Sequence, residues 1–186
     1  VILTLKTHDP DWSPYWQHLA RYAAFVVFVS MAVSDALDGY LARKKGQKTQ
    51  LGTFLDPTAD KLLMTTACVL LASEGAGVSG FLLPITVVVL IIGKDVLLSL
   101  GFVILYFMTS EAHIQPVWAG KLSTALQLIM VSAVLPAPEI SEYISGWIWV
   151  TRVLWWSAAG ASVLATLIYL RRGTRFVLEY ESAQQG

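Results

Sequence analysis

Charged residues are scarce in this chain, as are cysteine and histidine. Only 14% of the 186 residues are Asp, Glu, Lys or Arg, against about 25% in an ordinary soluble domain. The 13 basic and 13 acidic residues balance, so no net field favours nucleic acid as a partner. A single cysteine excludes an intrachain disulfide and a cysteine-based zinc site, and the three histidines lack metal-ligand spacing. Because no internal repeat or long linker divides the chain, we predict one domain over residues 1–186.

Hydrophobic residues, in contrast, make up 55% of the chain and gather in long stretches. A membrane-spanning helix needs about 20 mainly apolar residues. The stretches that approach or exceed this length are residues 18–41, 53–72, 80–107, 117–135 and 143–170. Residues 73–80 and 136–142 are rich in Gly, Pro and Ser, which predicts turns between antiparallel helices. The sequence therefore predicts an all-α, polytopic transmembrane helical bundle.

The distribution of basic residues predicts the orientation of this bundle. The first loop and the segment after the last stretch carry Arg43, Lys44, Lys45, Lys48, Arg171, Arg172 and Arg175. By the positive-inside rule these segments face the cytoplasm. A bacterial plasma membrane is the predicted location, and a mitochondrial inner membrane fits the same pattern. Residues 1–5 predict the end of a sixth, truncated helix at the N-terminus.

Four carboxylates lie in the first two stretches, where each ionisable group costs at least about 2.5–3.5 kcal/mol. Asp35 and Asp38 are three residues apart, and Asp56 and Asp60 are four apart, so each pair shares one helix face. The short loop brings both pairs to the cytoplasmic end. Oxygen ligands without His or Cys favour Mg²⁺ or Mn²⁺, and two such ions are a common clamp in phosphoryl chemistry. Asp56 alone is equally well explained as an N-cap before Pro57.

Small residues and an arginine accompany these acids. Gly39, Ala42 and Gly52 would let a flat base or a pyrophosphate approach the backbone closely. Arg43 could bind phosphate oxygens in bidentate fashion. Alternatively, Gly39 and Ala42 form a helix-packing face, and Arg43 pairs with one of the acids. The sequence leaves both interpretations open for each residue taken singly.

The combined pattern resembles a known family signature. Asp35-Ala-Leu-Asp38-Gly39-Tyr-Leu-Ala42-Arg43 and Gly52-Thr-Phe-Leu-Asp56-Pro-Thr-Ala-Asp60 fill every fixed position of D-x-x-D-G-x-x-A-R followed by G-x-x-x-D-x-x-x-D. This signature is that of the CDP-alcohol phosphatidyltransferases, whose members have six transmembrane helices and form homodimers. The resemblance implies transfer of a phosphatidyl group from CDP-diacylglycerol to an alcohol, with release of CMP.

The resemblance also implies a role for each motif position. Two divalent ions, Mg²⁺ or Mn²⁺, would be held by Asp35, Asp38, Asp56 and Asp60. The CDP group would be surrounded by Asp38, Gly39, Ala42, Arg43 and Gly52. Asp60 would also act as the general base for the acceptor hydroxyl.

Two lysines bear on the identity of the acceptor. Lys94-Asp95 lies in the middle of the third stretch, and Gly120-Lys121-Leu-Ser-Thr-Ala-Leu-Gln127 resembles a segment of phosphatidylglycerophosphate and cardiolipin synthases. Lys94 and Lys121 would bind the acceptor's phosphate. Since glycerol 3-phosphate and phosphatidylglycerol both carry one, we predict glycerol 3-phosphate narrowly, with phosphatidylglycerol as the alternative.

Each lysine also has a structural explanation. Lys121 is equally well explained as a lysine that snorkels at a helix end. Lys94 could pair internally with Asp95 or another acid, and it replaces an arginine of the family, so a point charge stands where a bidentate fork is usual.

Cation transport is a remote alternative, because buried acids also line ion pathways. Residues 23–34 and 62–73, the outer halves of the two acidic stretches, contain no Asp, Glu, Lys, Arg or His. A cluster confined to one side of the membrane favours an enzyme that uses cytoplasmic nucleotide substrates.

Overall fold

The computed structural model describes residues 14–45, 50–75, 78, 80–109 and 118–184. Within these ranges, the side chains of some residues are not described, among them those of residues 38–45 and 50–60. The helices are α2 (Pro14–Lys45), α3 (Gln50–Ala72), α4 (Ile85–Thr109), α5 (Trp118–Val134), α6 (Ala137–Tyr143) and α7 (Trp147–Gln184). No strand occurs among these residues. The all-α prediction is therefore confirmed for this part of the chain, whereas the predicted helix end at residues 1–5 lies outside it.

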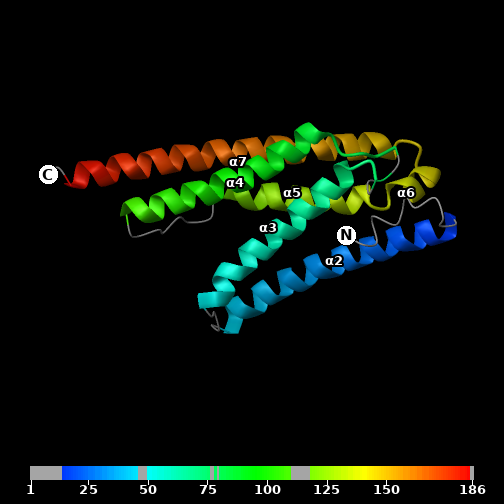
Figure 1. The fold of residues 1–186 in the computed structure, drawn as a ribbon, viewed down its shortest axis with the longest axis horizontal. Coiled ribbons are helices and arrows are strands. Elements are labelled where there is room, and N and C mark those ends of the chain that lie inside the picture. The colour runs from blue at the N-terminus through cyan, green and yellow to red at the C-terminus, as the bar shows by residue number, and fades with distance from the viewer. Residues whose placement is uncertain (1–13, 46–49, 76–77, 79, 110–117, 185–186) are drawn as a thin grey trace.

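The helices form a bundle and a hairpin (Figure 1). Helix α7 packs along both α4 and α5, and α6 lies against α7. Helices α2 and α3 form the hairpin, in which α3 packs on α4 and α5 while α2 packs on α5. Figure 1 shows that α2 ends and α3 begins at the same tip, which projects away from α7. The fold thus brings the two halves of the acidic motif to one end of the hairpin.

An apolar core joins the hairpin to the bundle. Its fully buried members include Cys68 and Leu71 of α3, Ile91 of α4, Met130 of α5 and Ala158 of α7. Van der Waals contacts among these closely packed side chains are individually small and collectively large. This core holds α3 against α4, α5 and α7.

The start of α4 differs from the prediction. The third apolar stretch was expected to be helical from residue 80, but α4 begins at Ile85. Gly80 has a φ of 80°, a conformation open to glycine and costly for other residues. Pro84 lies directly before the helix, and its carbonyl accepts the amide protons of Val87 and Val88 at 2.9 and 3.3 Å.

The predicted turn at residues 136–142 is also wrong, because the chain forms the short helix α6 there. Pro136 and Pro138 precede or occupy its first turn, where the missing N–H of proline costs nothing. The carbonyl of Pro136 accepts the amide of Ile140 at 3.1 Å, and the Ser141 hydroxyl donates to the Pro138 carbonyl at 2.7 Å. Helix α6 bends from α5 by 67°.

Each of the five predicted stretches coincides with a helix. Among the described residues, one helix segment, Trp147–Arg175, is long and apolar enough to cross a membrane, and the bent pair α5–α6 would make a second if it forms one span. In α3, the segment Lys61–Ala72 is apolar but shorter than a membrane span. The number of membrane crossings therefore stays a prediction.

Candidate active site

The acidic motif occupies the tip of the α2–α3 hairpin. Its first half lies in the last three turns of α2 and comprises Asp35, Asp38, Gly39, Ala42 and Arg43. Its second half lies in the first three turns of α3 and comprises Gly52, Asp56 and Asp60. Between the helices, residues 46–49 span at most about 18 Å. The side chains of these eight motif residues lie outside the described part, so their roles stay predictions.

The helix boundaries show whether Asp56 is an N-cap. Helix α3 begins at Gln50, so Asp56 lies in its second turn, beyond any capping position. The N-cap interpretation of Asp56 is therefore wrong. In a continuous helix, residues four apart lie on one face, which keeps Asp56 and Asp60 together.

Lys94 lies in the interior, on α4, with 4% of its surface exposed. Its Nζ donates to the hydroxyl of Ser123 on α5 at 3.2 Å and lies 3.4 Å from Oδ1 of Asp95. The internal pair that the sequence left open is thus present. A buried lysine needs such partners, because an unpaired buried charge is strongly destabilising.

Lys94 is supported by a hydrogen-bond network among the side chains of Ser123, Gln127 and Ser162. The Ser162 hydroxyl donates to the carbonyl of Ala158 at 2.8 Å, so Ser123 must donate in its 3.0 Å contact with Ser162. Gln127 donates to both hydroxyl oxygens at 3.1 Å. The oxygen of Ser123 therefore accepts from Lys94 and Gln127 and has no capacity left. The network joins α4, α5 and α7.

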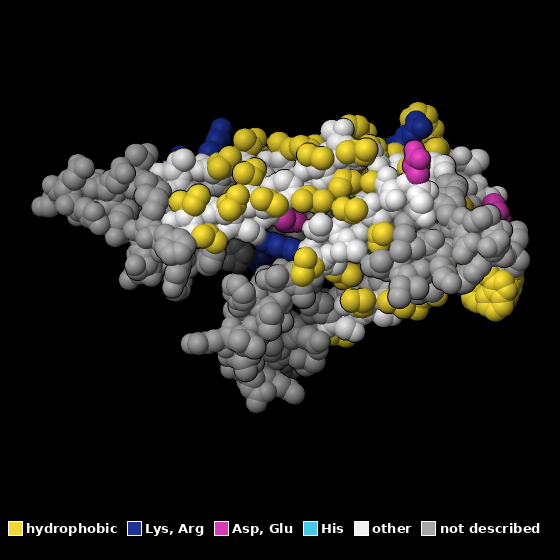
Figure 2. Space-filling model, viewed as in Figure 1, with side chains coloured by type: hydrophobic (Ala, Val, Ile, Leu, Met, Phe, Trp, Pro, Cys, Tyr) yellow, Lys and Arg dark blue, Asp and Glu magenta, His cyan; other side chains and the backbone are white. Residues whose placement is uncertain are grey.

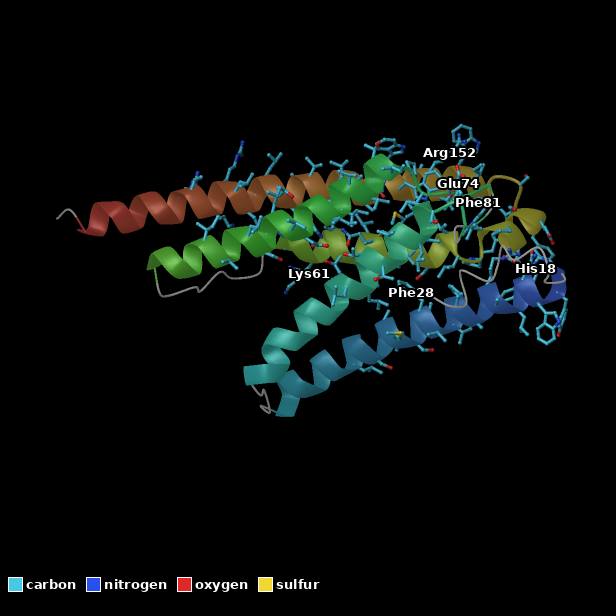
Figure 3. The ribbon with its side chains drawn as sticks, in the orientation of Figure 1. His18, Phe28, Lys61, Glu74, Phe81 and Arg152 are labelled. Atoms are coloured by element: carbon cyan, nitrogen blue, oxygen red, sulfur yellow. The ribbon has the colours of Figure 1, made fainter. Side chains whose placement is uncertain are left out.

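Lys61 links α3 to α4 beside this network. Its Nζ donates to the hydroxyl of Ser99 at 3.1 Å, and Ser99 donates to the backbone carbonyl of Asp95 at 2.8 Å. Figure 3 shows Lys61 on the part of α3 that lies below α4 and α5 in this view. Figure 2 shows Lys or Arg side chains beside an Asp or Glu side chain in a depression near the middle of the same face. Charged groups are therefore accessible from outside at this depth.

The Gly120-Lys121 segment lies at the start of α5. A Cβ added at Gly120 would lie 3.0 Å from the hydroxyl and 3.3 Å from a ring carbon of Tyr169 on α7. Gly120 therefore permits the close approach of α5 and α7. Lys121, the next residue, is exposed.

We expect Gly120→Val to destabilise the protein by about 1–3 kcal/mol, because the added methyl groups would overpack the contact with Tyr169. Gly160→Val is the matched control, since a Cβ added at Gly160 of α7 would meet nothing within 4 Å. Thermal unfolding in detergent should show a lower Tm for Gly120→Val than for Gly160→Val. Equal Tm values would contradict the packing role.

A second charged cluster lies far from the acidic motif. Glu139 of α6 accepts hydrogen bonds from Arg21 Nε and Nη2 at 2.9 and 2.8 Å, and its Oε1 lies 2.8 Å from His18 Nδ1. His18 and Arg21 belong to the first turns of α2, and Figure 3 shows His18 at the end of α2 that lies beside α6. Since Arg21 precedes Asp35 by about 21 Å along the helix, this cluster anchors the other end of α2.

Burial opposes ionisation of Glu139, but hydrogen bonds from His18 and Arg21 outweigh it and hold the pKa of the carboxyl below its ordinary value of 4.5. A depressed folded-state pKa stabilises the fold above the unfolded pKa, and this stabilisation is lost as pH falls through the folded value. We therefore expect Glu139→Gln to lower Tm at pH 6. That deficit should begin to shrink below about pH 4.5, where the unfolded carboxyl takes up a proton, and it should vanish as the pH falls through the lower folded-state pKa. A deficit independent of pH would contradict this account.

No group of three His, Cys, Asp or Glu side chains that could hold a metal is found in the described part of the chain. The four motif acids are not among the side chains described there. The placement of two ions at the acidic motif therefore stays a prediction.

Comparison with known proteins shows to which family the chain belongs. The family description CDP-alcohol phosphatidyltransferase matches residues 3–176. A CDP-diacylglycerol–glycerol-3-phosphate 3-phosphatidyltransferase of Pseudomonas fluorescens is 34% identical over 161 residues, which cover 85% of this chain and 77% of that protein.

Two further relatives are matched over a smaller share of their length. A cardiolipin synthase (CMP-forming) of Rattus norvegicus is 29% identical over 170 residues, 83% of this chain and 53% of the relative. A probable phosphatidylglycerophosphate synthase of Mycobacterium tuberculosis is 35% identical over 119 residues, 63% of this chain and 52% of the relative. The chain spans about half the length of these two proteins. The match over residues 3–176 and the Pseudomonas relative confirm the family predicted from the motif. The chain therefore belongs to the CDP-alcohol phosphatidyltransferases, which are transferases of phospholipid biosynthesis.

Proposed function

We propose that this enzyme transfers a phosphatidyl group from CDP-diacylglycerol to glycerol 3-phosphate and releases CMP. The observation that carries the proposal is the complete acidic motif on two helices that meet at one tip. The name of the Pseudomonas relative supports glycerol 3-phosphate as acceptor. The cardiolipin synthase relatives favour phosphatidylglycerol as the second candidate, at lower identity and shorter coverage.

Two divalent ions, Mg²⁺ or Mn²⁺, fit the donor chemistry of the tip. The proposed ligands are Asp35, Asp38, Asp56 and Asp60. All four provide oxygen only, as hard cations prefer, and the helical spacing keeps each pair on one face. When bound, the ions supply positive charge that neutralises the pyrophosphate of the substrate.

The proposed reaction is a displacement at phosphorus. Asp60 takes the proton of the acceptor hydroxyl, and the acceptor oxygen forms a bond to the lipid-bearing phosphorus. The bond from that phosphorus to the CMP oxygen breaks, so CMP leaves. Arg43 stabilises the charge that develops on the phosphate oxygens. The CDP group is surrounded by Asp38, Gly39, Ala42, Arg43 and Gly52.

Lys94 and Lys121 are proposed to bind the acceptor's phosphate. Lys121 is exposed on α5 and can meet an anion directly. The Nζ of Lys94 lies 3.4 Å from the carboxylate of Asp95. A phosphate bound at this Nζ would take the place of that carboxylate as its negatively charged partner.

A polytopic arrangement in the bilayer is supported by the outer faces of the helices. Exposed apolar side chains include Leu62 on α3, Val89 on α4 and Val153 on α7, each at least 60% exposed. Extended apolar surface of this kind is typical of contact with lipid or another protein. The basic residues around the hairpin loop support a cytoplasmic active site in a bacterial plasma membrane, and the family resemblance supports a homodimer.

An apolar cavity supports a lipid substrate. It has a volume of about 160 Å³ and lies between α2, α3 and α5, with Phe28, Leu63 and Val131 among its lining. Thr66 is the single polar residue in that lining. Such a cavity suits an acyl chain better than a nucleotide, because it offers the nucleotide almost no hydrogen-bond partner.

The acceptor can be tested by measuring CMP release from CDP-diacylglycerol in liposomes that contain the purified protein and Mg²⁺ or Mn²⁺. Glycerol 3-phosphate and phosphatidylglycerol are offered separately. We expect release with glycerol 3-phosphate. Release with phosphatidylglycerol alone would assign the enzyme to cardiolipin synthesis instead. Metal flux without CMP release would support transport.

A further inference from the structure

Lys61 lies on α3, whereas the other two lysines proposed for the site lie on α4 and α5. It directly follows Asp60, the proposed general base, on α3. Its Nζ reaches Ser99 of α4 at 3.1 Å, so the side chain extends toward α4. The acids and Arg43 of the first motif half belong to α2. Lys61 is therefore directed toward the helix that carries Lys94, where the acceptor is proposed to bind.

Lys61 also has capacity to bind an anion. A lysine ammonium has three N–H donors, and Ser99 accepts one of them. Within the described part of the chain no ion pair is formed by Lys61, whereas Lys94 is paired with Asp95 and bonded to Ser123. Lys61 is half-buried, so a bound anion would be partly shielded from water and held more strongly than at the surface.

Ser99 fixes the orientation of this ammonium. Its hydroxyl proton is used by the Asp95 carbonyl at 2.8 Å, so its oxygen can only accept from Lys61. Ser99 and Asp95 are one helical turn apart on α4. The same turn of α4 therefore holds Lys61 through Ser99 and faces Lys94 through the Asp95 carboxylate.

We propose that Lys61, oriented by Ser99, binds the acceptor's phosphate and determines the preference for a phosphorylated alcohol. This inference rests on the proposed transferase function, with Asp60 as the base. Consecutive side chains of a helix point in different directions, and the long Lys61 side chain reaches Ser99 on α4. The phosphate of an acceptor held between Asp60 and α4 would therefore lie within reach of this ammonium. The ammonium would then meet the phosphate as a point charge, with the two donors that Ser99 does not accept.

The test uses Lys61→Met, which keeps the length of the side chain and removes its charge. Kinetic constants are measured for glycerol 3-phosphate, for unphosphorylated glycerol and for CDP-diacylglycerol. We expect the KM for glycerol 3-phosphate to rise by about 10- to 100-fold, as expected for loss of a hydrogen bond to a charged group. The KM for CDP-diacylglycerol and the metal concentration for half-maximal rate should change less than about twofold. The preference for glycerol 3-phosphate over glycerol should fall by the same factor as the KM rises.

Three variants accompany this test. Lys61→Arg should recover part of the acceptor affinity because it restores the charge. Ser99→Ala should raise the KM for glycerol 3-phosphate by a smaller factor, because the ammonium remains but is no longer oriented. Arg152→Met is the control: Arg152 is an exposed cation of α7 that lies 5.1 Å from the Trp149 ring centroid, and its loss should leave all three KM values unchanged.

Two results would overturn the inference. An unchanged KM for glycerol 3-phosphate with a lower Tm would make Lys61 a purely structural tie between α3 and α4. A changed metal requirement or KM for CDP-diacylglycerol would place Lys61 with the metal and nucleotide groups. If wild type uses phosphatidylglycerol and not glycerol 3-phosphate, the proposed acceptor fails. Lys61 is then judged by the KM for phosphatidylglycerol, whose phosphate should meet the same ammonium.

Discussion

Asp60→Asn is expected to abolish CMP release while the protein remains folded. The amide cannot take the proton of the acceptor hydroxyl, and general base catalysis alone contributes about 10²- to 10⁴-fold in rate. It also removes one negative charge from the proposed metal ligands, so the loss should exceed that range. Asp60 lies in the third turn of α3, where Asn is tolerated by the helix at a cost of less than about 1 kcal/mol.

The measurement compares rates of CMP release with helicity and elution volume in detergent. Glu142→Gln is the matched control, since Glu142 is an exposed carboxylate of α6 outside the motif. It should keep wild-type turnover. An Asp60→Asn enzyme with full activity would remove Asp60 from the role of base.

Asp95→Ala is expected to destabilise the protein by about 3–5 kcal/mol, because it leaves the buried Lys94 without its counter-charge. Lys94 is 4% exposed, so water cannot replace the carboxylate. Ser123 would remain as a partner, but a neutral hydroxyl only partly offsets the cost of a buried ammonium.

Thermal or denaturant unfolding in detergent measures this loss. The double variant Lys94→Met with Asp95→Ala should recover much of the stability, since replacing both charges by apolar groups can be neutral or stabilising. Lys121→Met, which removes an exposed charge, should change stability by no more than about 0.5 kcal/mol. If Asp95→Ala unfolds like wild type, Lys94 is not held by this pair.

The sequence predicted the helices, and the meeting of both motif halves at one end of neighbouring helices, because both depend on short-range sequence patterns. Long apolar stretches leave little choice but helix, and all five coincide with helices. Asp56 and Asp60 are four residues apart, so helical periodicity alone places them on one face. The start of α4 was misplaced because Phe81 and Leu83 continue the apolar pattern, although Gly80 and Pro84 delay the helix.

Contacts between distant residues could not be predicted in the same way. Arg21 and Glu139 are 118 residues apart and meet only because α6 folds beside the start of α2. A signal was present, since His18 and Arg21 are three residues apart on one helix face, but nothing local identified their partner. Lys94 and Asp95 are neighbours, so their pairing was foreseen as an alternative. The bonds among Ser123, Gln127 and Ser162 depend on the register of α5 and α7.

Metal-dependent release of CMP tests the central claim most directly. The purified protein in detergent is supplied with CDP-diacylglycerol and glycerol 3-phosphate, first with a chelator and then with Mg²⁺ or Mn²⁺ restored. We predict no CMP with the chelator and full release when either ion is returned, because the proposed cluster of four carboxylates would repel a pyrophosphate until cations neutralise it. Release that is unaffected by the chelator, or no release with any acceptor from folded protein, would contradict the proposed mechanism.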